Sequence, residues 1–136
     1  MAETVRLEVV TPDREVLAVD TEEVVEVPGG DGLFGVLPGH APLIATVAPG
    51  IIAYLTAPDT QASLVVAGGF AIVQDGVVTV LAERAELPGE IDLEAAKAGL
   101  AEAQGALPGL SGDEENEVRG RIALNEGRIE VVARSR

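Results

Sequence analysis

The feature that most constrains this chain is a change of apolar periodicity after about ninety residues. Before the change, short runs rich in Val, Ile and Leu are separated by Pro and Gly, and Val5, Leu7 and Val9 alternate with charged residues. A period of two residues predicts strands, and many short strands at near-regular spacing favour a sandwich or a barrel. After the change, apolar residues recur every three or four positions, which predicts helices.

The first part contains several further strand-like runs. They cover 22–27, 43–47, 51–55, 64–67, 70–74 and 77–82. The last two flank Asp75-Gly76, the strongest short hairpin signal in the chain. Gly68-Gly69 is expected to form a bulge or a tight bend before a strand. Because Phe34, Tyr54 and Phe70 are the only aromatic residues, aliphatic side chains must fill the core.

The second part predicts two helices. Asp92 is suited to cap the first one, whose apolar stripe consists of Leu93, Ala96, Leu100, Ala103 and Leu107. After a break at 108–112, Ser111 or Asp113 can cap a second helix, whose stripe consists of Val118, Ile122, Ile129 and Val132. Two helices with a short turn between them form an antiparallel hairpin.

This hairpin is expected to be marginal on its own. Each glycine inside a helix costs roughly 1 kcal/mol relative to alanine. The glycines concerned are Gly99, Gly105, Gly120 and Gly127. Short helices gain most of their stability from packing, so the hairpin should need a partner surface. The sequence therefore predicts a mainly β chain with a helical appendage: a small β-sandwich over 1–87, followed by an antiparallel two-helix hairpin over 88–136.

Composition excludes several classes of function. The formal net charge is -14, which argues against nucleic acid and against direct binding to anionic lipid. Cysteine is absent, so disulfides, thiolate catalysis, zinc-thiolate sites and iron–sulfur clusters are excluded. No stretch is apolar for the roughly 18 residues of a membrane span, and the N-terminus is not a signal peptide. We therefore expect a soluble, cytosolic protein. If it works at a membrane, another protein must hold it there.

The C-terminal segment differs in charge from the acidic remainder. Residues 118–136 contain five arginines and two glutamates. Such a basic helix can meet an acidic partner surface, or it can fold back on the acidic body of its own chain, and composition does not decide between the two.

Motifs for catalysis are weak. His40 is the only histidine, and it is more simply explained as a turn residue than as a general base or a metal ligand. The segment from Gly30 to Gly35 fits G-x-G-x-x-G, but no helix or βαβ unit follows it, so a glycine-rich loop between strands is the better interpretation. No lysine stands in a phosphate-binding loop. We therefore expect no catalytic residue, no metal and no cofactor.

Two segments resemble a known family. The string Gly-Leu-Phe-Gly-Val-Leu-Pro-Gly-His-Ala-Pro-Leu over 32–43 is similar to the loop-and-strand signature of the epsilon subunit of F-type ATP synthases. Gly-Gly-Phe-Ala-Ile-Val over 68–73, followed by 77–82, resembles the second signature of that family. The resemblance covers nearly the whole chain and is most specific in the Gly-His-Ala-Pro-Leu string.

The resemblance implies a non-catalytic subunit of the central stalk, which takes part in ATP synthesis and proton transport. In that family the sandwich binds the gamma subunit and sits on the ring of c subunits. A c-ring-facing loop would contain Asp31, Leu33, Phe34 and His40, shaped by turns at Gly32, Gly35 and Gly39. The resemblance also implies a peripheral position at the cytoplasmic face of a bacterial plasma membrane, with a plastid thylakoid as the less favoured location.

The hairpin of the family is mobile, and it restrains ATP hydrolysis when it extends into the catalytic head. Basic residues of its second helix then face an acidic segment of the beta subunit, so the resemblance makes Arg119, Arg121 and Arg128 candidates, with Arg134 a weaker one. Some members bind ATP at a motif that corresponds to Ile91-Asp92. Its arginine position is occupied by Ala95 here, so we expect ATP binding to be weak or absent.

Two other functions stay open from the residues alone. One is a free-standing β-sandwich adaptor or ligand-binding module with a helical tail. The other is an enzyme that uses His40 as a general base. An adaptor should work alone in the cytosol, whereas a stalk subunit should be found in a membrane complex.

Overall fold

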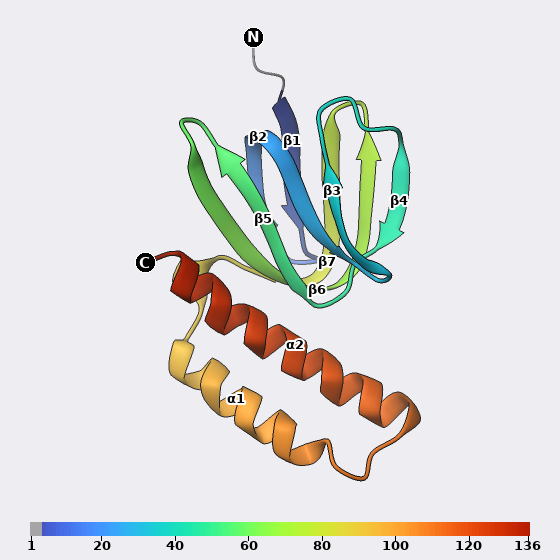
Figure 1. Ribbon diagram of the computed structural model, residues 1–136, viewed down its shortest axis with the longest axis vertical. Helices are drawn as coiled ribbons and strands as arrows, with labels where there is room; N and C mark the ends of the chain where they lie inside the picture. The colour runs from blue at the N-terminus through green and yellow to red at the C-terminus, as the bar shows by residue number, and fades with distance from the viewer. Residues whose placement is uncertain (1–3) are drawn as a thin grey trace.

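The computed structural model describes residues 4–136, in which the strands come first and the helices last. The strands are β1 (Thr4–Val10), β2 (Glu15–Gly29), β3 (Gly32–Val36), β4 (Leu43–Thr46), β5 (Gly50–Thr56), β6 (Thr60–Gln74) and β7 (Val77–Glu86). A short 3-10 helix η1 (Pro88–Glu90) leads to α1 (Leu93–Ala106) and α2 (Gly112–Arg134). The predicted fold class is confirmed: a β-sandwich is followed by two helices (Figure 1).

Two long strands join the layers of the sandwich. The strand order is β1-β7-β6-β5-β2-β3, and β1 also pairs with β2, while β4 pairs with β6. The first half of β2 pairs with β1, and its second half pairs with β3 and β5. Likewise, β6 pairs with β5 through its first half and with β4 through its second half. The sheet therefore folds over on itself, and its inner faces enclose one core.

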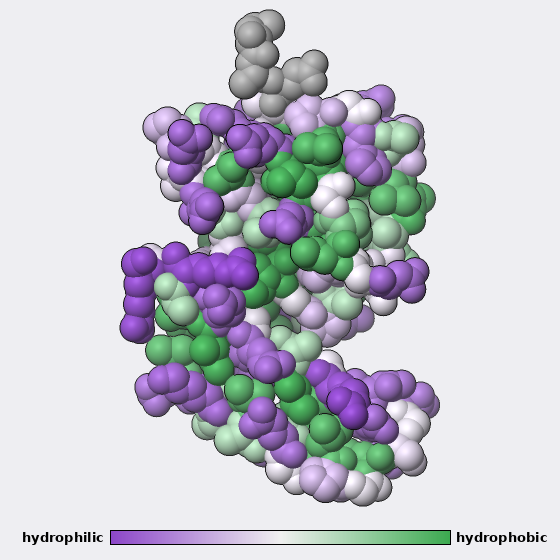
Figure 2. Space-filling view, in the orientation of Figure 1, coloured by the Kyte–Doolittle hydropathy of each residue, from purple (hydrophilic) through white to green (hydrophobic). Residues whose placement is uncertain are grey.

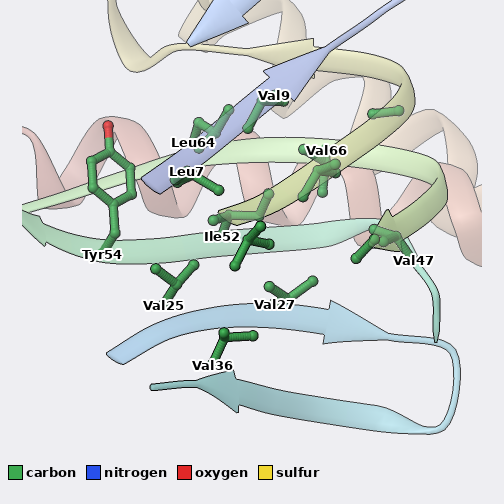
Figure 3. Packing of buried hydrophobic residues seen from close by; sticks show 14 of the residues in the cluster. Leu7, Val9, Val25, Val27, Val36, Val47, Ile52, Tyr54, Leu64 and Val66 are labelled. Atoms are coloured by element: carbon green, nitrogen blue, oxygen red, sulfur yellow. The ribbon is translucent and has the colours of Figure 1, made fainter. Parts of the chain in front are cut away.

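Aliphatic side chains fill this core, as the shortage of aromatic residues predicts (Figure 3). The fully buried members include Val5, Leu7, Val9, Val25, Val27, Ile52, Leu64 and Val66. They alternate with exposed or half-buried residues along β1, β2 and β5, which is the period of two seen in the sequence. Tyr54 is the one aromatic residue that is mostly buried, and burial raises the pKa of its hydroxyl.

The bend at Gly68-Gly69 lies inside one strand rather than between two. The sequence predicted separate strands over 64–67 and 70–74, but β6 is continuous. Both glycines have positive φ angles, of 70° and 120°, at the point where β6 passes from its pairing with β5 to its pairing with β4. A Cβ atom on Gly69 would collide with the carbonyl oxygen of Leu81. The predicted tight bend is therefore correct, whereas the predicted interruption is wrong.

The remaining turn and cap predictions are confirmed in part. Asp75 and Gly76 have φ angles of 52° and 78° and connect β6 to β7, as expected for a two-residue hairpin turn. The Asp92 carboxylate accepts a hydrogen bond from the backbone N–H of Ala95 at 3.1 Å, which caps α1. Ser111 occupies the N-cap position of α2, but its side chain makes no capping hydrogen bond.

The two helices form an antiparallel hairpin beside the sandwich (Figure 1). Helix α2 packs against β5 and β6, and α1 packs against the far side of α2. Ala96 and Ala103 of the first predicted stripe are buried between the helices. Apolar side chains gather along the seam between the helices (Figure 2). No helix in residues 4–136 is long and apolar enough to cross a membrane.

The predicted stripe of α2 is incomplete. Val118 is buried and Ile122, Ile129 and Val132 are half-buried, as expected. Leu124 and Val131 were not part of that stripe, yet both are buried against Val65 of the sandwich. Helix α2 lies between two partners and therefore buries two faces, of which a single stripe describes only one.

Candidate functional site

An apolar patch lies on the outer face of one layer of the sandwich. It consists of Ile44 on β4, Phe70 and Ile72 on β6, and Leu81 on β7. Ile44 pairs with Ile72 and Phe70 pairs with Leu81 in the antiparallel register, which places all four side chains on one face. Ile44 is 72% exposed and Phe70 is 53% exposed. Large apolar side chains exposed together, rather than singly, are typical of a surface that contacts another protein.

Charged residues bound this apolar patch. On the same face, the strands beyond β7 carry Arg6, Glu8 and Asp20. The Arg6 guanidinium lies 3.3 Å from the carboxylates of both Glu8 and Asp20. The outer face is therefore apolar over β4, β6 and β7 and charged over β1 and β2, which suits a contact with an apolar centre and a polar rim.

The segment predicted as one c-ring-facing loop, 31–42, is not a single loop. Residues Gly32–Val36 form β3, the edge strand that pairs with β2, and only 37–42 form a connecting loop. At about 3.3 Å per residue, β3 separates Asp31 from His40 by roughly 16 Å, so the two lie at opposite ends of the strand (Figure 1). The candidate residues are thus divided between two ends of the sandwich, and one end alone cannot present all of them.

Their side chains also differ in exposure. Leu33 is 65% exposed and lines a groove between the sandwich and α2, together with Pro28 and Ala123. Phe34, which the resemblance placed in the c-ring-facing loop, is half-buried and packs against the core, because alternate residues of β3 point to opposite faces. Asp31 is exposed in the turn before β3. Only Asp31 and Leu33 therefore form an exposed pair.

His40 has the structure of a turn residue. Its backbone N–H donates to the carbonyl of Leu37 at 3.1 Å, and its Nδ1 lies 2.6 Å from the carbonyl oxygen of Ala41. Among the candidate turn glycines, Gly32 and Gly39 have positive φ angles of 125° and 80°. Gly35 does not; it lies within β3, where a Cβ atom would come within 2.7 Å of the Val24 side chain.

Helix α2 reaches the sandwich through a small apolar contact. Leu124 and Val131 pack on Val65, with Ile51 and Ile91 at the edge of the cluster. Gly127 lies between them, and a Cβ atom there would come within 2.8 Å of the Val65 side chain. The close approach of helix and sheet thus depends on a glycine that the sequence alone marked only as destabilising.

A polar contact accompanies this cluster. The Arg128 guanidinium donates to both carboxylate oxygens of Glu86, the last residue of β7, at 2.6 and 2.9 Å. It also donates to the side-chain oxygen of Asn125 at 3.1 Å. The sequence did not point to Glu86 or Asn125, because the partners Glu86 and Arg128 are separated by 42 positions.

The other candidate arginines make pairs within the hairpin. Arg119 lies 2.7 Å from Glu115 within α2, and Arg121 lies 3.7 Å from Glu102 of α1. Arg134 lies 3.3 Å from Glu130. These three arginines are 45–60% exposed, whereas Arg128 is only 18% exposed. Arg119 and Arg121 are therefore open to solvent, and Arg128 is held against the sandwich.

An ion pair also fixes the segment between sandwich and hairpin. The Arg14 guanidinium donates to both carboxylate oxygens of Glu90 at 2.8 and 2.7 Å. The backbone N–H of Leu87 donates to the same carboxylate at 2.9 Å. The hydrogen bonds from Arg14 and then from Leu87 lower the pKa of Glu90 below its ordinary value of 4.5.

This lowered pKa makes the stability of the chain depend on pH. A carboxylate whose pKa is lower in the folded state stabilises the fold above its unfolded pKa, and the contribution is lost as the pH falls through the folded pKa. Glu90→Gln should therefore lower the thermal unfolding midpoint slightly at pH 7. The difference from the wild type should shrink as the pH falls below 4.5, the ordinary value, and should vanish once the pH is below the lowered pKa of Glu90 in the folded chain. Glu94→Gln is the matched control, because Glu94 is 86% exposed and lies 3.9 Å from Lys97. A gap that persists at acid pH would contradict the assignment.

The residues of the degenerate nucleotide motif have structural roles. Asp92 caps α1, and Ile91 packs at the edge of the cluster between α2 and the sandwich. Ala95 follows in the first turn of α1 and is exposed. Within residues 4–136, no group of three or more His, Asp or Glu side chains is placed to hold a metal ion.

Comparison with known proteins agrees with this picture. The family model described as "ATP synthase, Delta/Epsilon chain, beta-sandwich domain" matches residues 4–88. An ATP synthase epsilon chain of Geobacter metallireducens is 38% identical over 137 residues, which covers 99% of this chain and 98% of the relative. An ATP synthase epsilon chain of Myxococcus xanthus is 42% identical over 108 residues, which covers 79% of this chain and 78% of the relative.

Two solved structures share the fold. One chain of the Euglena gracilis mitochondrial ATP synthase, from a structure of OSCP, F1 and c-ring, matches with a TM-score of 0.78 at 24% identity. The match covers 98% of this chain and 83% of that chain. A chain from the central stalk and c-ring of the Tetrahymena thermophila mitochondrial ATP synthase matches with a TM-score of 0.59 at 12% identity, over 98% and 97% of the two chains.

Proposed function

The chain belongs to the ATP synthase epsilon-chain family, and on that premise we propose that it couples rotation of a c-ring to the catalytic head as part of the central stalk. The observation that carries this proposal is the exposed apolar patch on the sandwich that the family model covers. We propose that the chain has no active site of its own and contributes only through protein contacts.

The apolar patch is the proposed docking face for the gamma subunit. Ile44, Phe70 and Leu81 of this patch are exposed in the isolated chain, and Ile72 is half-buried. Burial of large apolar side chains is the main source of stability in lasting protein contacts. The opposite layer of the sandwich is less suitable, because α2 already covers part of it at β5 and β6. The sequence alone could not choose between the two faces; the uncovered patch favours this one.

The turn between β2 and β3 is the proposed contact with the c-ring. Asp31 and Leu33 are both exposed there, and they combine a charge with a large apolar side chain. Phe34 is not part of this contact, because it packs against the core. His40 is also excluded, since β3 places it at the other end of the sandwich. Contacts of this kind would hold the chain at the cytoplasmic face of a bacterial membrane through protein partners alone.

The hairpin is the proposed restraint on ATP hydrolysis. Within residues 4–136, its attachment to the sandwich rests on an apolar cluster around Val65 and an ion pair at Glu86. Such an element can leave the sandwich at a cost of only a few kcal/mol, which is the condition for a two-state switch. In the extended state Arg119, Arg121 and Arg128 would face an acidic segment of the beta subunit. We propose weak or no binding of ATP to this hairpin, because Ala95 supplies no guanidinium.

Truncation of the chain after Leu87 tests this function in the assembled complex. The truncated chain should still be recovered with alpha, beta, gamma and c subunits from gently solubilised membranes, because the sandwich carries the docking face. ATP hydrolysis by that complex should rise severalfold over the complex with the full chain, since the restraint is gone. An unchanged rate of hydrolysis would contradict the restraint. Recovery of the tagged full chain alone, from the soluble fraction, would favour the free-standing adaptor instead.

A further inference from the structure

The contact between Arg128 and Glu86 is the strongest polar link between hairpin and sandwich. It joins the guanidinium Nε and one terminal nitrogen to both carboxylate oxygens, which is the parallel two-bond geometry that makes such pairs strong. Arg128 is 18% exposed and Glu86 is 29% exposed, so solvent screens the pair less than it screens the exposed pairs. The link therefore depends on α2 lying against the sandwich.

Asn125 holds the guanidinium in place. Its side-chain oxygen accepts from Arg128, and its side-chain nitrogen donates to the carbonyl of Arg121 at 3.1 Å. Asn125 is 7% exposed and also faces Gly99 of α1, where a Cβ atom would come within 3.0 Å of it. The guanidinium is therefore oriented by the packing of α2 on α1 and is directed at the end of β7.

The edge of the guanidinium that binds Glu86 cannot bind a second carboxylate in the same geometry. Nε and its neighbouring nitrogen form one of the two forks of the group that match a carboxylate. Arg119 and Arg121 already face solvent in the docked hairpin, whereas Arg128 does not. Of these three arginines, only Arg128 loses its carboxylate partner when the hairpin leaves the sandwich, because Glu115 and Glu102 belong to the hairpin itself.

We propose that Arg128 has two mutually exclusive carboxylate partners, Glu86 in the docked hairpin and an acidic side chain of the beta subunit in the extended one. Glu86 is thereby a regulatory residue: it competes with the catalytic head for a single guanidinium. This inference rests on the proposed function of the hairpin. It differs from a purely structural ion pair in one respect: removal of Glu86 and removal of Arg128 must change ATP hydrolysis in opposite directions.

The isolated chain tests the Glu86 half of the proposal. The chain contains no cysteine, so spin labels can be placed at Gln61→Cys on β6 and Gln104→Cys on α1, both exposed positions. Glu86→Gln and Arg128→Gln should each raise the ratio of undocked to docked hairpin by about tenfold, because a charged two-bond contact is lost. Arg119→Gln is the matched control and should leave the distance distribution unchanged. Unchanged distances in both Glu86→Gln and Arg128→Gln would overturn the proposal.

The assembled complex tests the exchange itself. Glu86→Gln frees Arg128 for the beta subunit, so ATP hydrolysis should fall at least about twofold below the wild-type complex as the extended state gains population. Arg128→Gln removes the shared group, so hydrolysis should rise above the wild-type rate although the hairpin undocks more readily. Changes in the same direction for both variants would overturn the proposal.

Two further variants separate this proposal from the function on which it rests. The double variant E86R/R128E should restore docking in the isolated chain, because the pair is reversed, yet it should leave the complex uninhibited. Full inhibition by this double variant would overturn the shared role of Arg128. If truncation after Leu87 relieves hydrolysis but Arg128→Gln does not, the exchange fails and the proposed function stands. If truncation also has no effect, the proposed function itself fails.

Discussion

Replacing Phe70 and Ile44 with aspartate is expected to prevent assembly of the chain into the ATP synthase complex while leaving its fold intact. Both side chains are more than half exposed, so the isolated chain loses little buried apolar area. A carboxylate buried in an apolar contact without a partner costs several kcal/mol, so the double variant should bind the gamma subunit at least about 100-fold more weakly. Binding of the isolated variant to purified gamma subunit measures this directly.

A control on the same face separates docking from general damage. Ala18→Asp introduces one aspartate on β2, at an exposed position beside Glu8 in the charged half of the face. It should bind the gamma subunit within a fewfold of the wild type. Thermal unfolding should show that all three proteins remain folded. Equal binding by the double variant and the wild type would mean that the apolar patch is not the docking face.

Local rules predicted the elements of this fold well. The Asp75-Gly76 turn and the Asp92 cap both form as expected, because each depends only on residues within a few positions. The predicted alternation of buried and more exposed residues along β1 is also observed, because one face of that strand is buried in the core. The sequence therefore supports the order of sandwich and hairpin without reference to distant contacts.

The errors occur where an element has more than one partner. The continuous β6 belongs to both layers, so its glycines bend the strand without ending it. Helix α2 lies between α1 and the sandwich and buries two faces, so the single predicted apolar stripe did not include Leu124 and Val131. Strand β3 is a separate case, in which pairing with β2 makes a strand of a segment that was expected to be a loop. Such outcomes depend on tertiary context, which no local periodicity contains.

The candidate site was less predictable than the fold. The apolar patch is formed by strands that carry apolar residues on both faces, so the sequence cannot tell the outer side chains from the core. Glu86 and Arg128 meet only because α2 folds back across the end of β7. Five arginines lie in the basic C-terminal segment, and only the fold distinguishes Arg128, which is held against the sandwich, from those exposed to solvent.

Gly127→Ala is expected to detach the hairpin from the sandwich without touching a charge. The new Cβ atom would come within 2.8 Å of the Val65 side chain, which is completely buried and has no room to move. Overpacking of this kind costs about 1–3 kcal/mol, so the ratio of undocked to docked hairpin should rise by one to two orders of magnitude. The label pair at Gln61→Cys and Gln104→Cys measures this ratio in the isolated chain.

Two matched variants test whether the contact between position 127 and the Val65 side chain controls docking. Gly120→Ala gives α2 the same gain in helix propensity, but its Cβ atom would meet only Pro49, at an ordinary 3.9 Å, so docking should not change. Val65→Ala removes the atom that Gly127→Ala would strike, so the double variant should dock again.

In the complex, Gly127→Ala keeps Arg128 and should therefore inhibit hydrolysis more strongly than the wild type. Normal docking of Gly127→Ala would show that the helix can shift on the sheet, and the close approach at Gly127 would then not control the switch.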